Sequence, residues 1–126
     1  IPQCVLIRAV EPLEGIDKMI ERRKTKKILD LASGPGKFCQ AFGFNRTFYG
    51  FDITKPEFVF SDDDSRKKNM KKRTPSKVYL EDRGKIIQKG QISVAKRIGI
   101  DYAEEWADKL LRFYISSSPY VSFKKL

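Results

Sequence analysis

"KTKKILDLASGPGKFCQAFGFNRTFYGFDI", residues 24–53, poses the main question about this fold. An apolar run at 28–31 meets a Gly-Pro-Gly turn at 34–36, and a short amphipathic segment then leads to a second apolar run that ends near Asp52. This order is typical of the first half of a nucleotide-binding α/β unit: strand, glycine turn, helix, and an acidic residue that holds a ribose. A capped helix that begins at Pro35 explains the same residues in a different way.

The first interpretation is a methyltransferase. "ILDLASGPG" resembles the first motif of the class I S-adenosylmethionine-dependent enzymes, and "FYGFDI" resembles their acidic strand end. Such a fold needs further strands that alternate with helices, whereas a lysine-rich stretch at 61–77 follows here. Pro35 also lacks the N–H that a cofactor loop would use, so this interpretation is kept as the alternative.

The second interpretation is a helix start. Proline suits the first helical position because its missing N–H costs nothing there, with Ser33 or Gly34 as the cap. Gly43 can close the helix in a left-handed conformation. A helix start that carries Lys37 is a natural phosphate site, and an ordinary capped helix with a solvated lysine is the alternative.

The rest of the chain predicts an α+β fold. The pattern of residues 4–10 predicts a buried strand. The charge of Arg8 in this strand must either pair with a carboxylate in the core or point into a cleft. The pattern of residues 16–23 predicts a helix. Short strands are expected within 78–100, and a final strand within 111–122.

A capping box of Asp101 and Glu104 predicts one more helix, with four side chains turned inward. These are Tyr102, Ala103, Trp106 and Leu110. We therefore expect a single domain over residues 1–126, with a curved, mostly antiparallel, open-barrel-like sheet and peripheral helices.

Composition points to a polyanionic partner. The chain has 126 residues and a formal net charge of +10, which favours nucleic acid as the partner, with a solvated basic surface as the alternative. Histidine is absent. Cys4 and Cys39 are expected to be buried thiols of an intracellular protein, and residues 61–77 a flexible basic insertion. With no apolar run of spanning length, no membrane association is expected.

Three segments together resemble the alkyladenine, or 3-methylpurine, DNA glycosylase family. They are "LIRAVEPLEG" (6–15), "SGPGKFCQAFGF" (33–44) and "RIGIDYAEEWADKLLRFYISSSPYVS" (97–122), and their order and spacing agree with the family. The resemblance implies a monofunctional enzyme of base excision repair without metal or cofactor. Such an enzyme flips a damaged purine out of the duplex and hydrolyses its N-glycosidic bond with an activated water.

The resemblance also implies roles for individual residues. Arg8 matches the arginine that helps to hold the nucleophilic water, and Ile98 matches the position whose backbone carbonyl accepts a hydrogen bond from that water. Leu6 is expected near the base pocket, with a core role as the alternative. The expected DNA-binding residues at the helix start are Ser33, Gly36 and Lys37.

The family's general-base glutamate, its base-stacking aromatic residues and its intercalating tyrosine lie upstream of the matched part. We therefore expect this chain to be the C-terminal half of a glycosylase, inactive alone, and we assign neither Glu11 nor Glu14 as the base. The implied partners are double-stranded DNA with a damaged purine and the missing N-terminal half, in a monomeric protein that is nuclear if eukaryotic. A non-catalytic DNA-binding module is the remaining alternative.

Overall fold

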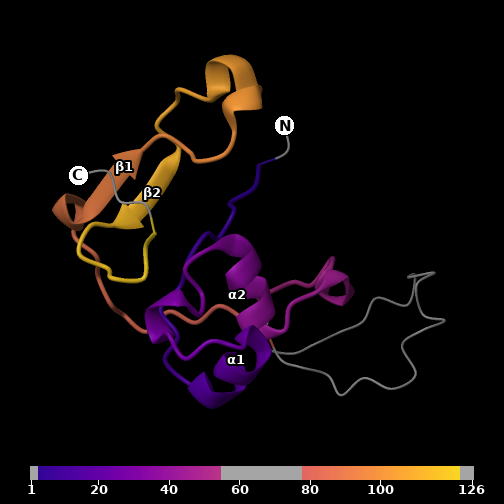
Figure 1. The fold of residues 1–126 in the computed structure, drawn as a ribbon. Coiled ribbons are helices and arrows are strands. Elements are labelled where there is room, and N and C mark those ends of the chain that lie inside the picture. The colour runs from indigo at the N-terminus through magenta and orange to yellow at the C-terminus, as the bar shows by residue number, and fades with distance from the viewer. Residues whose placement is uncertain (1–2, 55–77, 123–126) are drawn as a thin grey trace. The chain divides into compact units, whose positions relative to one another are not determined.

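The computed structural model describes residues 3–54 and 78–122. The expected basic insertion at 61–77 and the apolar piece at 58–60 lie outside these residues. Contacts within the chain divide it into two compact units, 1–47 with 86–126 and 48–85, and each is described by itself (Figure 1). Of the helices in the part described, none is long and apolar enough to cross a membrane.

Two short helices form the core of the larger unit. Helix α1 spans Ile16–Arg23, with the bounds that the apolar spacing predicts, and helix α2 spans Pro35–Phe42. Met19 of α1 and Ala41 of α2 enclose Leu31, whose side chain has no solvent exposure. Because this cluster is small, most of the apolar side chains of the described residues remain near the surface.

The end of α2 confirms the role expected for Gly43. Its φ of 75° is left-handed, its N–H donates to the Gln40 carbonyl at 3.2 Å, and the Phe44 N–H donates to the Cys39 carbonyl at 2.8 Å. These two bonds make a Schellman motif, which satisfies carbonyls at the end of the helix. The Phe44 ring then packs on Phe38, with centroids 5.3 Å apart.

The segment before the glycine turn is not a strand. Residues Ile28–Asp30 form the 3-10 helix η1, whose last turn is closed by a bond from the Leu31 N–H to the Ile28 carbonyl at 3.1 Å. The methyltransferase interpretation needs a strand at this position, so the local structure does not support it. Within residues 3–54 and 78–122, two further 3-10 helices precede the sheet, η2 at Arg46–Phe48 and η4 at Lys89–Gln91.

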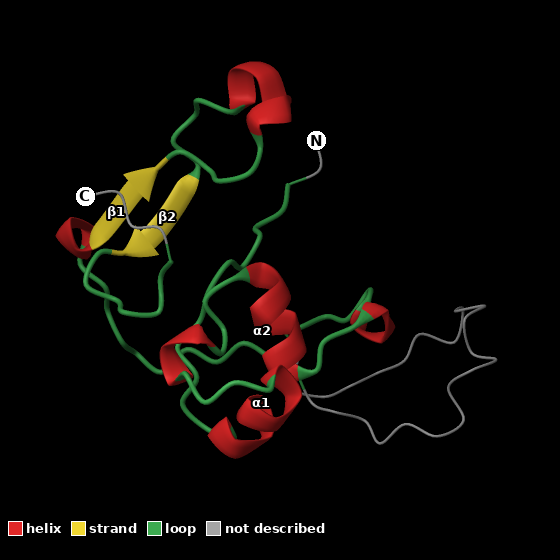
Figure 2. Cartoon of the chain, viewed as in Figure 1, coloured by secondary structure: helices red, strands yellow, loops and turns green. Residues whose placement is uncertain are grey.

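An antiparallel pair of strands forms the sheet of the described residues, as Figure 2 shows. Strand β1 spans Ile92–Ala95 and strand β2 spans Arg112–Ile115. With the helices, this pairing is consistent with the predicted α+β class, and β2 lies within the predicted final strand at 111–122.

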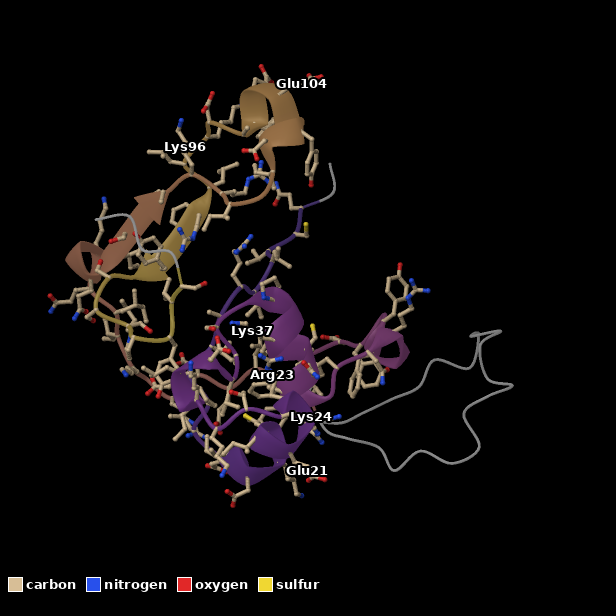
Figure 3. All side chains as sticks on the ribbon, viewed as in Figure 1. Glu21, Arg23, Lys24, Lys37, Lys96 and Glu104 are labelled. Carbon is tan, nitrogen blue, oxygen red and sulfur yellow. The ribbon has the colours of Figure 1, made fainter. Side chains whose placement is uncertain are left out.

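The helix expected from Asp101 has a different form. Residues Asp101–Trp106 form the 3-10 helix η5, which is kinked because Glu104 adopts φ 48° and ψ −127° (Figure 3). No side-chain cap bond forms, so the expected capping box is wrong. Three of the side chains expected to face inward are largely exposed: Tyr102 at 83%, Trp106 at 50% and Leu110 at 57%.

The expected first strand is also wrong. Residues 3–10 have no regular secondary structure, and within this segment Val5 is 91% exposed. No other described segment pairs with it as a strand, and Leu6 is 66% exposed as well. The expectation of buried thiols fails as well, because Cys4 and Cys39 are both exposed.

In the smaller unit, the described residues form a turn around Asp52. Its Oδ1 accepts hydrogen bonds from the Thr54 N–H at 3.0 Å and from the Thr54 hydroxyl at 2.6 Å. The Leu80 N–H donates to the Ile53 carbonyl at 2.8 Å. Asp52 thus closes a local turn, which accounts for the residue that the methyltransferase interpretation would assign to a ribose.

Candidate functional site

Helix α2 begins without a side-chain cap. Gly34 precedes it in an extended conformation, Pro35 takes the first position, and the Gly34 carbonyl accepts the Phe38 N–H at 2.8 Å. The N–H groups of Gly36 and Lys37 belong to the first turn, where a helix has no internal acceptors and carries partial positive charge. This geometry suits an anion at the glycine turn.

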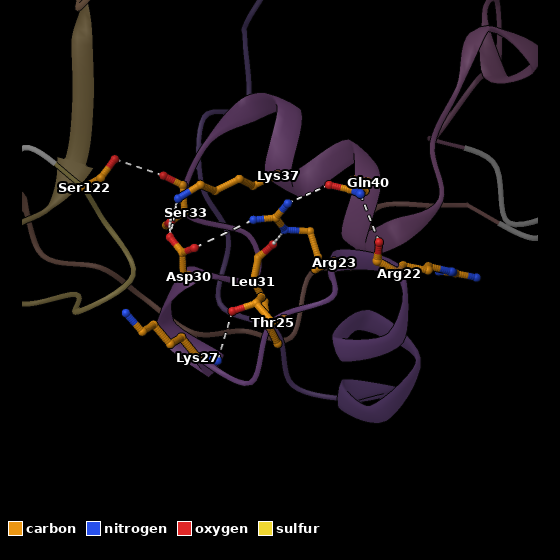
Figure 4. Close-up of polar contacts among 10 residues, drawn as sticks. All are labelled: Arg22, Arg23, Thr25, Lys27, Asp30, Leu31, Ser33, Lys37, Gln40 and Ser122. Atoms are coloured by element: carbon orange, nitrogen blue, oxygen red, sulfur yellow. Dashed lines mark hydrogen bonds and ion pairs between the residues drawn. The ribbon is translucent and has the colours of Figure 1, made fainter.

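A carboxylate holds the lysine of this turn (Figure 4). Lys37 Nζ donates to Asp30 Oδ1 and, at 3.4 Å, to the Ser33 hydroxyl. Ser33 in turn donates to Asp30 Oδ1 at 3.2 Å. Arg23 completes the cluster, because one of its terminal nitrogens lies 3.8 Å from Asp30 Oδ2.

The cluster carries more positive than negative charge. The hydrogen bond from Lys37, with the charges of Lys37 and Arg23, holds the pKa of Asp30 below its ordinary value of 3.8, so Asp30 is ionised at neutral pH. One carboxylate then faces two cations. The side chains of Lys37 and Asp30 are 39% and 41% exposed, so the excess positive charge is open to a ligand from solvent.

Arginine side chains join the two helices around this cluster. Arg23 donates through Nε to the Leu31 carbonyl at 3.1 Å and through Nη1 to Gln40 Oε1 at 2.6 Å. Gln40 returns a hydrogen bond to the Arg22 carbonyl at 2.9 Å, and Arg22 donates to the Ala41 carbonyl at 3.0 Å. These bonds fix α2 on α1 and leave the start of α2 open.

Two carbonyl groups just before the glycine turn bind distant parts of the chain. The Ala32 carbonyl accepts the Val10 N–H at 3.2 Å, and the Ser33 carbonyl accepts the Ser122 hydroxyl at 3.0 Å. Arg112, which is only 8% exposed, steadies the second contact by donating to the Ser122 carbonyl at 2.7 Å. We call residues 32–33 with these contacts the turn junction. It links the segments at 6–15, 33–44 and 97–122 to one another.

Comparison with known proteins identifies the family to which the chain belongs. The family model of methylpurine-DNA glycosylase matches residues 1–119. The chain belongs to this family. The match includes the turn of α2, the loop after β1 and nearly all of the C-terminal segment.

Curated relatives agree with the family assignment. A protein of Clostridium novyi, provisionally named as a 3-methyladenine DNA glycosylase, is 37% identical over 132 residues, which cover 98% of this chain and 54% of the relative. A protein of Natranaerobius thermophilus with the same provisional name is 36% identical over 96% of the chain and 52% of its own length. Human DNA-3-methyladenine glycosylase is 36% identical over 94% of the chain and 37% of its own length. The chain thus spans about half the length of the bacterial relatives.

The structure brings together some of the expected glycosylase residues. Ser33 and Lys37 share hydrogen bonds at the start of α2. Arg8 is half-buried in the unstructured segment before Val10, and no side chain within residues 3–54 and 78–122 forms a hydrogen bond or ion pair with it. Leu6 is 66% exposed, so it takes no part in the core of the described residues.

Ile98, the last of the expected residues, lies half-buried in the loop between β1 and η5. Two contacts close this loop: Lys96 pairs with Asp108 at 2.6 Å, and Arg97 donates to the Trp106 carbonyl at 3.0 Å. Lys109 Nζ also lies over the Trp106 ring, 3.4 Å from its centroid. The loop is therefore held at its base. Within residues 3–54 and 78–122 no hydrogen bond joins it to Arg8, so the convergence of Arg8 and Ile98 stays a prediction.

Sequence reasoning missed the residues that support Lys37. Asp30, Arg23 and Gln40 make the bonds described above, yet none belongs to a motif with fixed spacing. The one usable signal was Asp30, an acidic residue inside an apolar run beside a glycine turn. Only the methyltransferase interpretation assigns this run to a strand, and a strand would direct Asp30 differently from η1.

Proposed function

We propose that the chain forms part of a DNA glycosylase of base excision repair. Its substrates are alkylated or deaminated purines in double-stranded DNA, including 3-methyladenine, 7-methylguanine and hypoxanthine. The observation that carries this proposal is the family match over residues 1–119, together with the turn junction that links the three characteristic segments.

The proposed reaction is hydrolysis after base flipping. The enzyme extrudes the damaged nucleotide, because the glycosidic carbon cannot be attacked within the base stack. The oxygen of a water molecule bonds to C1′ of the sugar, the bond between C1′ and the purine nitrogen breaks, and a proton from water ends on the departing base. An abasic site remains in the DNA.

Arg8 and Ile98 are the proposed residues for the water. The Arg8 guanidinium donates to the water oxygen, and the Ile98 carbonyl accepts one water hydrogen, so the remaining lone pair points toward C1′. Arg8 suits this role because it is half-buried and has no bonded partner within the described residues. As the family resemblance implies, the general base in this proposal comes from outside this chain, and neither Glu11 nor Glu14, which are exposed before α1, is assigned to that role.

The turn of α2 is the proposed phosphate contact. Gly36 lets the DNA backbone approach, because no atom lies within 4 Å of the position that a Cβ would take there. Lys37 adds a cation that Asp30 and Ser33 already hold in place. Leu6, exposed on the segment that carries Arg8, contributes to the base pocket.

The complete enzyme, as we propose it, is a monomeric single domain with a curved, mostly antiparallel, open-barrel-like sheet. This chain supplies its C-terminal half, and the other half supplies the base pocket walls and the base. No cofactor is required. The protein acts where its DNA substrate lies, which is the nucleus in a eukaryote and the nucleoid in a bacterium.

Excision can be tested directly. The chain is mixed with the polypeptide of the Clostridium novyi relative that the alignment with this chain does not cover. Release of 3-methyladenine and hypoxanthine from a defined duplex is then followed in single turnovers. We expect release, and an Arg8→Ala chain should slow it by about 10²-fold while DNA affinity changes little. A folded pair that releases neither base refutes the glycosylase proposal, and an unchanged rate with Arg8→Ala refutes only the role of that residue.

Phosphate contact has a separate test. Lys37→Gln should weaken DNA binding and lower the slope of log affinity against log salt by about 1. Lys18→Gln is the matched control, because Lys18 is exposed on α1 and takes no part in the hydrogen bonds among Asp30, Ser33 and Lys37. Equal slopes for both variants would show that Lys37 has no special role.

The net charge of +10 supports a second candidate, a catalytically silent DNA-binding module. This module would bind DNA with strong salt dependence and would not distinguish a duplex with hypoxanthine from an undamaged one, because counterion release carries no lesion information. The same binding assay, run with both duplexes, separates the two candidates.

A further inference from the structure

A carboxylate lies inside the proposed phosphate contact. Asp30 ends η1, Lys37 belongs to the first turn of α2, and the two side chains meet across the glycine turn (Figure 4). Asp30 Oδ1 also accepts the Ser33 hydroxyl at 3.2 Å. A negative side chain repels the negative ligand that this turn is proposed to bind, so the position of Asp30 calls for a reason.

Lys37 is the cation of this cluster that can turn toward a ligand. A lysine ammonium group has three hydrogen-bond donors, and here two are directed to Asp30 Oδ1 and to the Ser33 hydroxyl. The Lys37 side chain is 39% exposed and has a flexible four-carbon stem. A phosphate that arrives from solvent can therefore reach the same nitrogen that Asp30 holds.

Arg23, in contrast, is fixed in place. Its side chain is only 14% exposed, and it donates to the Leu31 carbonyl at 3.1 Å and to Gln40 Oε1 at 2.6 Å. Its other terminal nitrogen lies 3.8 Å from Asp30 Oδ2. When Lys37 turns away, Asp30 thus keeps Arg23 and the Ser33 hydroxyl, so the exchange leaves no isolated charge on the protein.

A phosphate must either share Lys37 Nζ with Asp30 or take it from Asp30. In the first case two negative groups surround one ammonium group, and in the second case the ion pair of Asp30 and Lys37 is lost. Both side chains are more than one third exposed, so the loss has the size of an exposed ion pair. Such a loss corresponds to about a two- to fivefold change in affinity.

We infer that Asp30 competes with the DNA phosphate for Lys37 and so limits the affinity of the α2 start for DNA. The inference rests on the phosphate contact proposed above and adds a residue that weakens it. Contacts to the DNA backbone carry no lesion information. Asp30 therefore shortens the time that the protein spends on damaged and undamaged sites alike, and helps it to leave undamaged DNA.

Binding of the full chain to a fluorescent, undamaged duplex tests the inference without any assay of excision. Anisotropy gives Kd, and stopped flow gives the dissociation rate. Asp30→Asn should lower Kd by about two- to fivefold, mainly through slower dissociation. Lys37→Gln should raise Kd. Because both variants lose the same ion pair, a change in the stability of the fold does not account for opposite effects on affinity.

Two more variants separate competition from other effects of residue 30. The double variant Asp30→Asn with Lys37→Gln should bind within about twofold of Lys37→Gln alone, because Asp30 then has no lysine to withhold. Asp30→Glu retains the charge and should keep Kd within about twofold of the wild type.

Asp108→Asn is the matched control for net charge. It removes one negative charge, as Asp30→Asn does, from a residue that also pairs with a lysine, Lys96, at 2.6 Å. Asp108 follows η5 and takes no part in the contacts at the start of α2 that involve Asp30. Asp108→Asn should therefore tighten binding less than Asp30→Asn.

Three results would overturn the inference: a Kd that Asp30→Asn leaves unchanged or raises, equal tightening by Asp108→Asn, or tightening by Asp30→Asn that persists fully without Lys37. The proposals can also fail separately. If Lys37→Gln has no effect on binding, the phosphate contact is refuted and the competition with it. If Lys37→Gln weakens binding and Asp30→Asn does not tighten it, only the competition is refuted, and release of a damaged base is decided by its own assay.

Discussion

Replacing Asp30 by asparagine tests whether the charge cluster at the start of α2 stabilises the fold. Asp30 accepts hydrogen bonds from Lys37 and Ser33 and lies 3.8 Å from a terminal nitrogen of Arg23. Asparagine keeps the size and one acceptor oxygen of the side chain but removes its charge. The variant therefore isolates the ionic part of these contacts.

The expected loss of stability is modest. Asp30 and Lys37 are both more than one third exposed, and exposed ion pairs contribute about 0.2 to 1 kcal/mol. The contact with Arg23, whose side chain is only 14% exposed, is less screened and adds a similar amount. We therefore expect D30N to lower the free energy of unfolding by about 1 to 1.5 kcal/mol.

The dependence on pH provides the sharper assay. Because the pKa of Asp30 is lowered in the folded protein, the stabilisation is complete above its ordinary value of 3.8 and is lost as pH falls through the lower folded value. Urea unfolding of both proteins should thus show the full difference at pH 6 to 7. The difference should shrink below about pH 4 as the carboxyl group takes up a proton.

Asp108→Asn is the control for this experiment. Lys96 also lowers the pKa of Asp108 through a hydrogen bond, but Asp108 is 79% exposed and pairs with no cation other than Lys96 in the described part of the chain. Its replacement should leave the unfolding midpoint nearly unchanged. Equal effects of the two variants, or a D30N effect that persists at the lowest pH, would refute the view that Asp30 stabilises the fold as an ionised group.

Three further changes test the packing of α1 and α2 by thermal or urea unfolding. Leu31→Ala should cost about 2 to 5 kcal/mol because Leu31 is fully buried, whereas Leu29→Ala, at a position that is 52% exposed, should change stability by about 0.5 kcal/mol or less. Gly43→Ala should cost about 1 to 2 kcal/mol, since φ is 75° and the new Cβ would meet the Arg22 guanidinium at 3.3 Å. Gly36→Ala should instead stabilise α2 by about 0.5 to 1 kcal/mol, because the position is helical and open. A stabilising Gly43→Ala would contradict the structure at the end of the helix.

Helix termini were the most predictable part of this fold. Pro35 and Gly43 each act through the backbone torsions of a single residue, so the sequence alone locates the two ends of α2. The bounds of α1 follow in the same way from local apolar spacing. These features need no information about the rest of the chain.

Features that depend on a distant partner were predicted poorly. Residues 4–10 were expected to form a buried strand, yet they are unpaired, and Tyr102 and Trp106 are exposed where an inward face was expected. An apolar pattern predicts that a segment is buried, but it does not identify the part of the protein that packs against the segment. Of the candidate site, Ser33 and Lys37 were found because a helix start is local, while Asp30 was not recognised as their support because its role depends on the fold of η1.

The turn junction has a consequence for mutational surveys. The Val10 contact joins two main-chain groups, and both acceptors of the junction are carbonyl oxygens, those of residues 32 and 33. An alanine scan leaves both oxygens in place, and position 32 is alanine already. The attachment of the segment at Val10 would therefore remain invisible to such a scan, whereas Ser122→Ala would remove the hydroxyl that donates to the Ser33 carbonyl. A depsipeptide bond between Ala32 and Ser33 would reveal the attachment at Val10, because an ester carbonyl is a weaker hydrogen-bond acceptor than an amide carbonyl.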